Sequence, residues 1–180
     1  AEFKARHTLL MSYKLTMNRF KLKKKKKAVR KLEAILKTEK NIIPVSILIK
    51  IYHKLGLFYN ILRDTERSIS FLSEGRQLAE KNNLIADKIA FESYLMIRKF
   101  TANNSLAGEC LEFHKRNFPA LLELHTEVSQ VIEFELNYLR FLIYANDPLA
   151  EDITSDYLSR QILYSRKADA LNSWYLELSD

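Results

Sequence analysis

The chain contains few of the residues that turns, sheets and cross-links require. Its 180 residues include three glycines, three prolines and one cysteine, Cys110. So few turn-forming residues argue against a β-sandwich, a barrel or a doubly wound sheet. One cysteine excludes a disulfide framework and an all-cysteine zinc site. The most apolar stretch, residues 42–62, is interrupted by Pro44 and by charged residues, so it cannot span a bilayer. We therefore expect an intracellular protein, nuclear or cytoplasmic, without membrane contact.

The hydrophobic pattern is helical almost throughout. Apolar residues recur at three- and four-residue steps, and no stretch alternates with a period of two. This predicts an all-α chain, with Pro44 and Pro119 at helix boundaries. We expect a single helical-repeat domain over residues 1–180, as a fragment of a longer chain. Its expected helix pairs cover residues 5–40, 44–83, 84–118 and 124–166, with a final helix at 168–179.

A repeated spacing of small residues predicts how these pairs are arranged. One small residue opens the second helix of each expected pair, at intervals of 40, 39 and 43 residues: Ala28, Ser68, Ala107 and Ala150. In the first three pairs a leucine follows four positions later: Leu32, Leu72 and Leu111. Small residues at recurring positions let neighbouring helices approach closely. The spacing therefore predicts antiparallel helix pairs stacked as a right-handed α-solenoid with a period of about 40 residues.

Residues 45–83 carry the most specific pattern. The first helix has Tyr52, Leu55-Gly56 and Tyr59, and the second has the small and apolar series Ser68, Phe71, Leu72, Gly75 and Leu78. This block resembles the tetratricopeptide repeat, although Ser68 and Gly75 stand where that family usually has alanine. Residues 71–79 also resemble part of the helical-repeat region of separases, the cohesin-cleaving proteases. That second resemblance implies the regulatory helical region of a larger cell-cycle enzyme, with the protease dyad elsewhere in the protein.

Groups that could carry catalysis do not converge. The sequence has no glycine-rich phosphate loop, no nucleophile elbow and no HExxH motif. Cys110 and His114 are four residues apart and could share a helical face, but two ligands are too few for zinc. We interpret them as a buried thiol beside a partly exposed histidine. The sequence thus predicts a non-enzyme with no catalytic residue, metal or cofactor.

A basic run is the most unusual feature of the composition. Residues 21–31 hold eight bases and no acid, which leaves 21 basic against 22 acidic residues in the rest of the chain. The bases of this run are Lys21, Lys23, Lys24, Lys25, Lys26, Lys27, Arg30 and Lys31. Because lysines oppose the dipole at a helix N-terminus, we expect a solvated loop and a helix beginning near Ala28. The functional alternatives are a nuclear import signal, contact with an acidic partner, and nucleic-acid binding.

Together these features favour a protein-interaction scaffold that recognises a peptide or a partner helix, as in a larger multi-subunit complex. The first helix of each pair is expected to line the concave face of the solenoid. The residues expected to contact the partner there are Lys50, His53, Asn60, Arg98 and Asn137. The regulatory region of an enzyme and nucleic-acid contact through residues 21–31 are the two alternatives.

Overall fold

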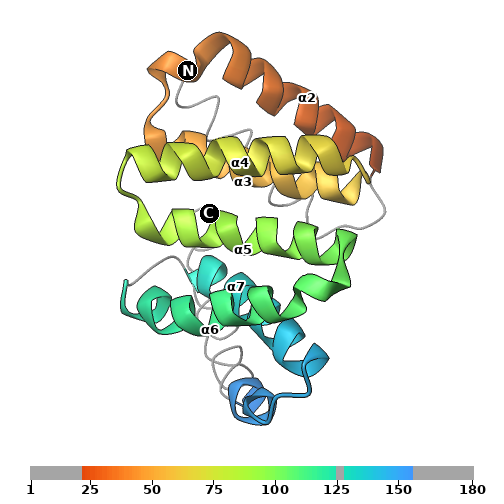
Figure 1. Cartoon of the computed structure of the whole chain (residues 1–180). Coiled ribbons are helices and arrows are strands. Elements are labelled where there is room, and N and C mark those ends of the chain that lie inside the picture. Colours follow the sequence, from red (N-terminus) through yellow and green to blue (C-terminus); the bar gives the residue numbers. More distant parts are fainter. Residues whose placement is uncertain (1–21, 125–127, 156–180) are drawn as a thin grey trace, which may run out of the picture. The chain divides into compact units, whose positions relative to one another are not determined.

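The computed structural model describes residues 22–124 and 128–155, and every regular element within them is a helix (Figure 1). This confirms the all-α prediction for the described residues. The α-helices are α2 (Leu22–Glu39), α3 (Val45–Ile61), α4 (Thr65–Lys81), α5 (Ile85–Ala102), α6 (Ala107–Glu123) and α7 (Val128–Tyr144). Two 3₁₀ helices, η1 (Lys40–Ile42) and η2 (Asn104–Leu106), follow α2 and α5. Residues 149–155 are also helical.

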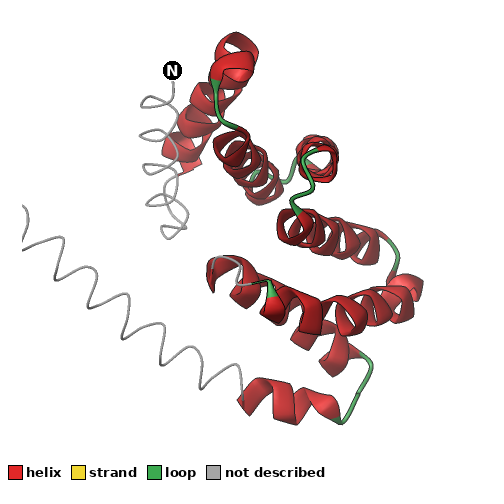
Figure 2. Ribbon diagram, turned by 90° about the vertical axis from the view of Figure 1, so that its left-hand side faces the viewer, coloured by secondary structure: helices red, strands yellow, loops and turns green. Residues whose placement is uncertain are grey.

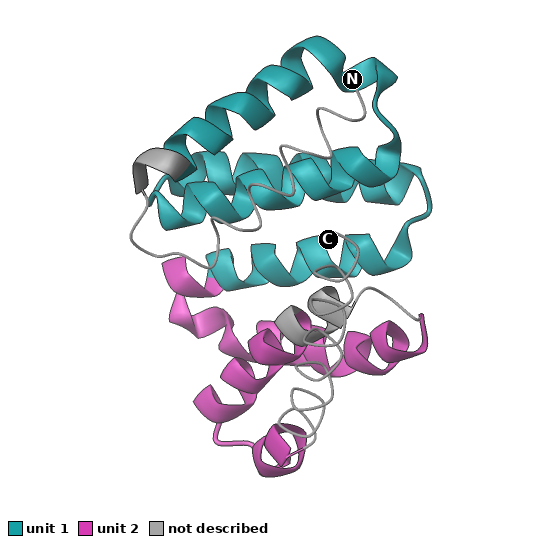
Figure 3. Cartoon of the chain, turned by 180° about the vertical axis from the view of Figure 1, so that it is seen from behind, with its two compact units in different colours: residues 1–99 teal, residues 100–180 magenta. Residues whose placement is uncertain are grey.

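The chain divides into two compact units, residues 1–99 and residues 100–180 (Figure 3). The described part of unit 1 consists of α2, α3, α4 and nearly all of α5. The described part of unit 2 contains α6 and α7, which pack against each other, and the helical residues 149–155. The expected pairs 5–40 and 124–166 extend beyond the described residues, and the expected helix at 168–179 lies wholly outside them.

Helix α3 forms the centre of unit 1. Its buried residues Ile51, Leu55 and Phe58 pack with Leu32 and Ile35 of α2 in one apolar cluster. Its opposite side contributes Ile49 and Tyr52 to a second cluster, which includes the following helices α4 and α5. A helix that is apolar on several sides is suited to burial between neighbours. Followed along the chain in Figure 2, α4 lies to one side of α3 and α5.

The ends of α4 are specified by side chains that the sequence presents at its boundaries. The carboxylate of Asp64 accepts a hydrogen bond of 3.1 Å from the backbone N–H of Arg67, as an N-cap residue does. After the last residue of α4, Asn83 adopts a left-handed conformation with φ of 55°. Asparagine tolerates this region better than most residues, which allows the chain to reverse into α5.

Two predicted boundaries are wrong. Helix α2 begins at Leu22, so the lysines of residues 22–27 are helical and do not form a loop. Lysine is a good helix former, and the apolar stripe from Ala28 onward packs on α3, which together outweigh the unfavourable dipole. Pro119 lies inside α6, which continues to Glu123. Phe118 and Leu121 on either side of this proline are buried, so packing holds the helix together across it.

Small residues lie at the helix contacts of the block that resembles a tetratricopeptide repeat. The Ser68 hydroxyl donates a hydrogen bond of 2.8 Å to the carbonyl oxygen of Gly56, which joins α4 to α3. A Cβ on Gly56 would lie 2.5 Å from a methyl carbon of Leu72. Helices α3 and α4 therefore pack at a distance that the absence of a side chain at position 56 allows.

The four positions expected to be equivalent do not share one environment. Ala28 and Ser68 are buried, with 7% and 0% of their surfaces exposed. Ala107 is the first residue of α6, Ala150 is the second helical residue after Pro148, and both are only half-buried. Of these four positions, only Ala28 and Ser68 therefore lie at buried contacts. The right-handed solenoid with one contact point every 40 residues stays a proposal.

Candidate functional site

The facing sides of α3 and α5 bring together most of the residues predicted to bind a partner. The ring of His53 lies edge-on to two rings of α5, with centroid distances of 5.9 Å to Phe91 and 4.9 Å to Tyr94. Phe91 and Tyr94 are three residues apart and so share one face of α5. The histidine is therefore held in one orientation by aromatic packing from the opposite helix.

A polar contact lies further along the same two helices. The guanidinium of Arg98 donates a hydrogen bond through Nη1 to the side-chain oxygen of Asn60. Asn60 is seven residues after His53, so these two share one face of α3. Arg98 is four residues after Tyr94, so these two share one face of α5. Lys50, three residues before His53, is half-buried on this side of α3. Four of the five predicted residues thus form one surface of unit 1, which we call the α3–α5 face.

The fifth predicted residue belongs to a different environment. Asn137 lies on α7 in unit 2, and only 6% of its surface is exposed. It shares a helical side with the buried residues Phe134, Tyr138 and Phe141. The packing side of α7 therefore includes Asn137, and its contact with a partner stays a prediction.

Burial determines the charge of the two described histidines. Burial, helped by the charge of neighbouring Lys54, lowers the pKa of His53 to about 3. Burial also lowers the pKa of His114 to about 4, although its hydrogen bond to Cys110 acts in the opposite direction. Both side chains are therefore neutral at pH 7, and a contact made by His53 with a partner would be a contact of a neutral ring.

Cys110 and His114 are parts of the core of unit 2. The thiol is buried, as predicted, but His114 is fully buried and the expectation of partial exposure is wrong. Its Nδ1 lies 2.7 Å from the carbonyl oxygen of Cys110, so the neutral ring donates a hydrogen bond there. Four aromatic rings surround it, those of Phe113, Phe134, Tyr138 and Phe141. Within the described ranges no group of three or more histidine, cysteine, aspartate and glutamate side chains could hold a metal ion.

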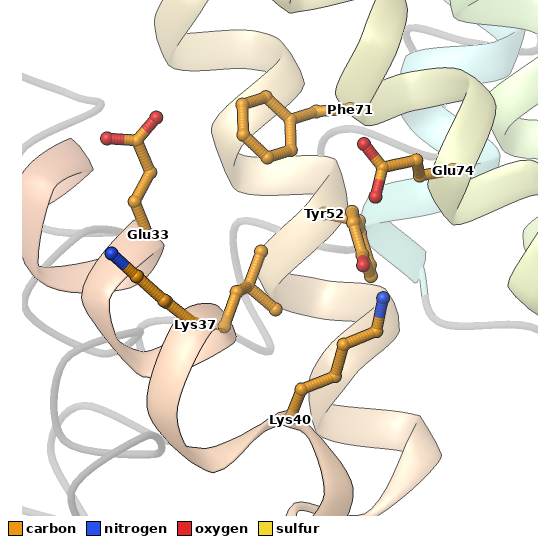
Figure 4. Close-up of a pocket in the computed structure, with 7 residues that line it drawn as sticks. Glu33, Lys37, Lys40, Tyr52, Phe71 and Glu74 are labelled. Carbon is orange, nitrogen blue, oxygen red and sulfur yellow. The ribbon is translucent and has the colours of Figure 1, made fainter.

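A pocket of about 300 Å³ opens between α2, α3 and α4 in unit 1 (Figure 4). Its walls are Tyr52 and Phe71, whose ring centroids are 6.3 Å apart, together with Leu36. Charged side chains form its edge, Glu33 and Lys37 on α2, Lys40 on η1 and Glu74 on α4. The sequence shows that positions 52 and 71 are aromatic. The pocket itself depends on how α2 lies against α3 and α4, which hydrophobic periodicity does not specify.

The polar groups of this pocket are already engaged with one another. The ammonium of Lys40 lies 5.4 Å from the centroid of the Tyr52 ring. A hydrogen bond with Tyr52 raises the pKa of Lys40, and burial raises the pKa of the Tyr52 hydroxyl. At the other edge, the hydroxyl of Tyr59 donates a hydrogen bond of 2.5 Å to Glu33. At pH 7 Lys40 is therefore a cation and Tyr52 a neutral hydroxyl.

The basic run is partly a structural element. Lys25 is 1% exposed, and it lies three and four residues before the buried Ala28 and Val29 on the packing side of α2. Four bases of the run are exposed, Lys26, Lys27, Arg30 and Lys31. Lys21 lies outside the described residues, and the side chains of Lys23 and Lys24 are not described.

None of the helices in the described part of the chain is both long enough and apolar enough to cross a membrane. Comparison of the chain with models of known protein families, with curated proteins and with solved structures finds no match.

Proposed function

We propose that this chain is a non-catalytic protein-interaction module that recognises a peptide or a partner helix on the α3–α5 face. The observation that carries the proposal is the pairing of Asn60 with Arg98 and of His53 with Tyr94 across two helices. These contacts fix four side chains of mixed chemistry before any partner arrives. Pre-organised side chains lose less conformational entropy on binding, so more of the contact energy is available as affinity.

The residue types on this face suit recognition. Tyrosine and arginine are enriched among the residues that dominate binding energy at protein interfaces. Lys50, Arg98 and the neutral His53 combine positive charge with aromatic surface. From Lys50 to Asn60 the face extends about 15 Å along α3. That length accommodates about three turns of a partner helix or four to five residues of an extended peptide.

The experiment compares partner binding by charge-reversed variants of the full chain. Lys50→Glu and Arg98→Glu change the face, while Arg63→Glu and Lys81→Glu change exposed bases near the two ends of α4. A partner isolated with the wild-type chain is purified, and its dissociation constant is measured by calorimetry against each variant. We expect at least tenfold weaker binding for the two face variants and less than a twofold change for the controls.

Because Arg98 is half-buried, its replacement also tests folding. Circular dichroism and the more conservative Arg98→Lys variant separate the two effects, since a lysine keeps the charge and loses the planar guanidinium. Equal affinities for all variants that remain helical would reject the α3–α5 face as the binding surface.

A further inference from the structure

The exposed face of α2 is a continuous basic strip. At 100° per residue, the exposed side chains of Lys26, Lys27, Arg30, Lys31 and Lys37 fall within one side of the helix, and the strip contains no acidic residue. The strip also includes Ala34 and Thr38, which are small and uncharged. From Lys26 to Lys37 it extends about 16 Å, the length of about five residues of extended peptide.

The nearest acid on α2, Glu33, borders this strip, and its carboxylate accepts a hydrogen bond from another helix. Glu33 is half-buried and accepts the hydrogen bond from Tyr59 of α3, whose hydroxyl also accepts a bond of 3.0 Å from Arg67 of α4. The carboxylate is therefore held by Tyr59 of α3, and Arg67 of α4 is bonded to the same hydroxyl. Against the five bases of the strip, α2 carries two acids, Glu33 and Glu39, so the strip keeps a net positive charge.

The strip leads directly into the pocket between α2, α3 and α4. Lys37 belongs to both, because it is exposed on the strip and lines the pocket beside Leu36 (Figure 4). The pocket walls formed by Leu36, Tyr52 and Phe71 offer apolar and aromatic surface to one large side chain, and its volume of about 300 Å³ is sufficient for it. At the far wall, the opposite charges of Glu74 and Lys40 leave no net attraction for a further acidic group. A basic strip thus ends in an apolar pocket with a carboxylate beyond it.

We propose that this surface, the α2 strip with its pocket, binds an acidic peptide segment that ends in a large apolar side chain. Four or five acidic residues lie along Lys26, Arg30 and Lys37, and a phenylalanine or leucine that follows them enters the pocket. Carboxylates complement the strip, while the apolar side chain complements Tyr52 and Phe71. Such a two-part ligand has a defined direction, because its acidic part is attracted to the strip and its apolar side chain is accommodated only in the pocket.

The same features favour a peptide over a nucleic acid. The strip has no aromatic side chain on which a base could stack and no amide side chain that could read a base edge. The edge of the pocket holds two carboxylates, Glu33 and Glu74, and two lysines, Lys37 and Lys40, so it offers no net positive charge to a phosphate backbone that continues there. The proposal concerns a surface separate from the α3–α5 face and does not depend on it, so Arg98→Glu is expected to leave this binding unchanged.

The test uses the full chain and fluorescence polarisation of three labelled probes. The first is a peptide of five glutamates followed by glycine and phenylalanine, the second replaces its phenylalanine by alanine, and the third is a 20-base-pair DNA duplex. The protein variants are Lys26→Gln/Arg30→Gln on the strip and Lys81→Gln/Arg116→Gln as a charge-matched control at exposed positions. Glutamine is a good helix former, so both double variants should fold.

We expect the phenylalanine peptide to bind about tenfold more tightly than the alanine peptide, as burial of one aromatic side chain allows. The strip variant should weaken binding threefold to tenfold at 50 mM salt and less at 200 mM, because screening reduces the effect of exposed charges. The control variant should change it less than twofold. Equal binding of the two peptides would show that the pocket is not used, and an unchanged affinity of the strip variant would remove the strip. If the duplex binds more tightly than the peptides and the strip variant loses this binding, the ligand is a nucleic acid and not a peptide. Each of these three results overturns the proposal.

Discussion

Gly75 of α4 lies directly against the ring of Phe91 of α5, so that a Cβ on the glycine would be 2.3 Å from the ring carbon Cζ. The phenylalanine is 2% exposed and also packs edge-on against His53. The ring of Phe91 can therefore lie here only because position 75 has no side chain. The same ring packs against His53 of the α3–α5 face.

Replacement of Gly75 by alanine should destabilise unit 1. In a helix, alanine is normally favoured over glycine by about 1 kcal/mol. Here the added methyl group overlaps a buried ring, and overpacking typically costs about 1–3 kcal/mol. The net loss should be visible in urea unfolding followed by circular dichroism. Gly108→Ala is the matched control, because no atom lies within 4 Å of a Cβ there and the change should be stabilising. Stabilisation by Gly75→Ala would contradict the packing of α4 on α5.

The hydroxyl of Tyr59 joins three helices, since it donates to Glu33 of α2 and accepts from Arg67 of α4. Tyr59→Phe removes both hydrogen bonds and keeps the stacking of this ring on Phe71, whose centroid is 5.5 Å away. We expect a loss of about 1–2 kcal/mol in the free energy of unfolding, since both partners are charged but partly exposed. Tyr144→Phe, at a residue 54% exposed, should change it by less than about 0.5 kcal/mol. Equal effects of the two variants would argue against the three-helix network.

The stability of unit 2 should fall in mild acid. The pKa of His114 is about 4 in the folded chain and about 6.5 when unfolded, so the unfolded state binds more protons below pH 6.5. The stability that this group contributes is complete above pH 6.5 and is lost progressively as the pH falls toward 4. Between pH 7 and pH 5 the loss is about 2 kcal/mol.

The measurement is urea unfolding at pH 7 and pH 5 for the wild type and for His114→Phe, which keeps an aromatic ring among the four rings that surround position 114. The variant should lose a large part of the pH dependence. Some should remain, because the lowered pKa of His53 acts in the same direction in unit 1. An identical pH dependence in both proteins would show that His114 is not held neutral by the core.

Much of the helical architecture could be predicted because its signals are local. The three- and four-residue spacing of apolar side chains indicated the helices. The ends of α4 are local as well, since Asp64 caps it through its carboxylate and Asn83 tolerates a left-handed backbone. Pro119 and the lysines of α2 failed as boundary markers, because a local preference was outweighed by the packing of α6 and α2. Such packing involves residues far apart in the sequence.

The candidate site was predictable only in part for the same reason. His53 and Asn60 share a face by their spacing, so their grouping follows from helical periodicity. The contact of Asn60 with Arg98 joins residues 38 positions apart, and it depends on how α5 lies against α3. Asn137 was grouped with them as a residue in the first helix of a pair, but the side of α7 that packs is determined by its neighbours in unit 2. The pocket at Tyr52 and Phe71 likewise needs three helices in place.

Site-specific photo-cross-linking shows whether the partner lies on the α3–α5 face. A photo-reactive amino acid replaces Lys50 on the α3–α5 face or, as a control, Ser70 on the exposed side of α4. After irradiation with the purified partner, position 50 should form a covalent adduct, excess unlabelled chain should compete it away, and position 70 should form none. Adducts at position 70 but not at position 50, in a chain that still binds the partner, would contradict recognition through the α3–α5 face.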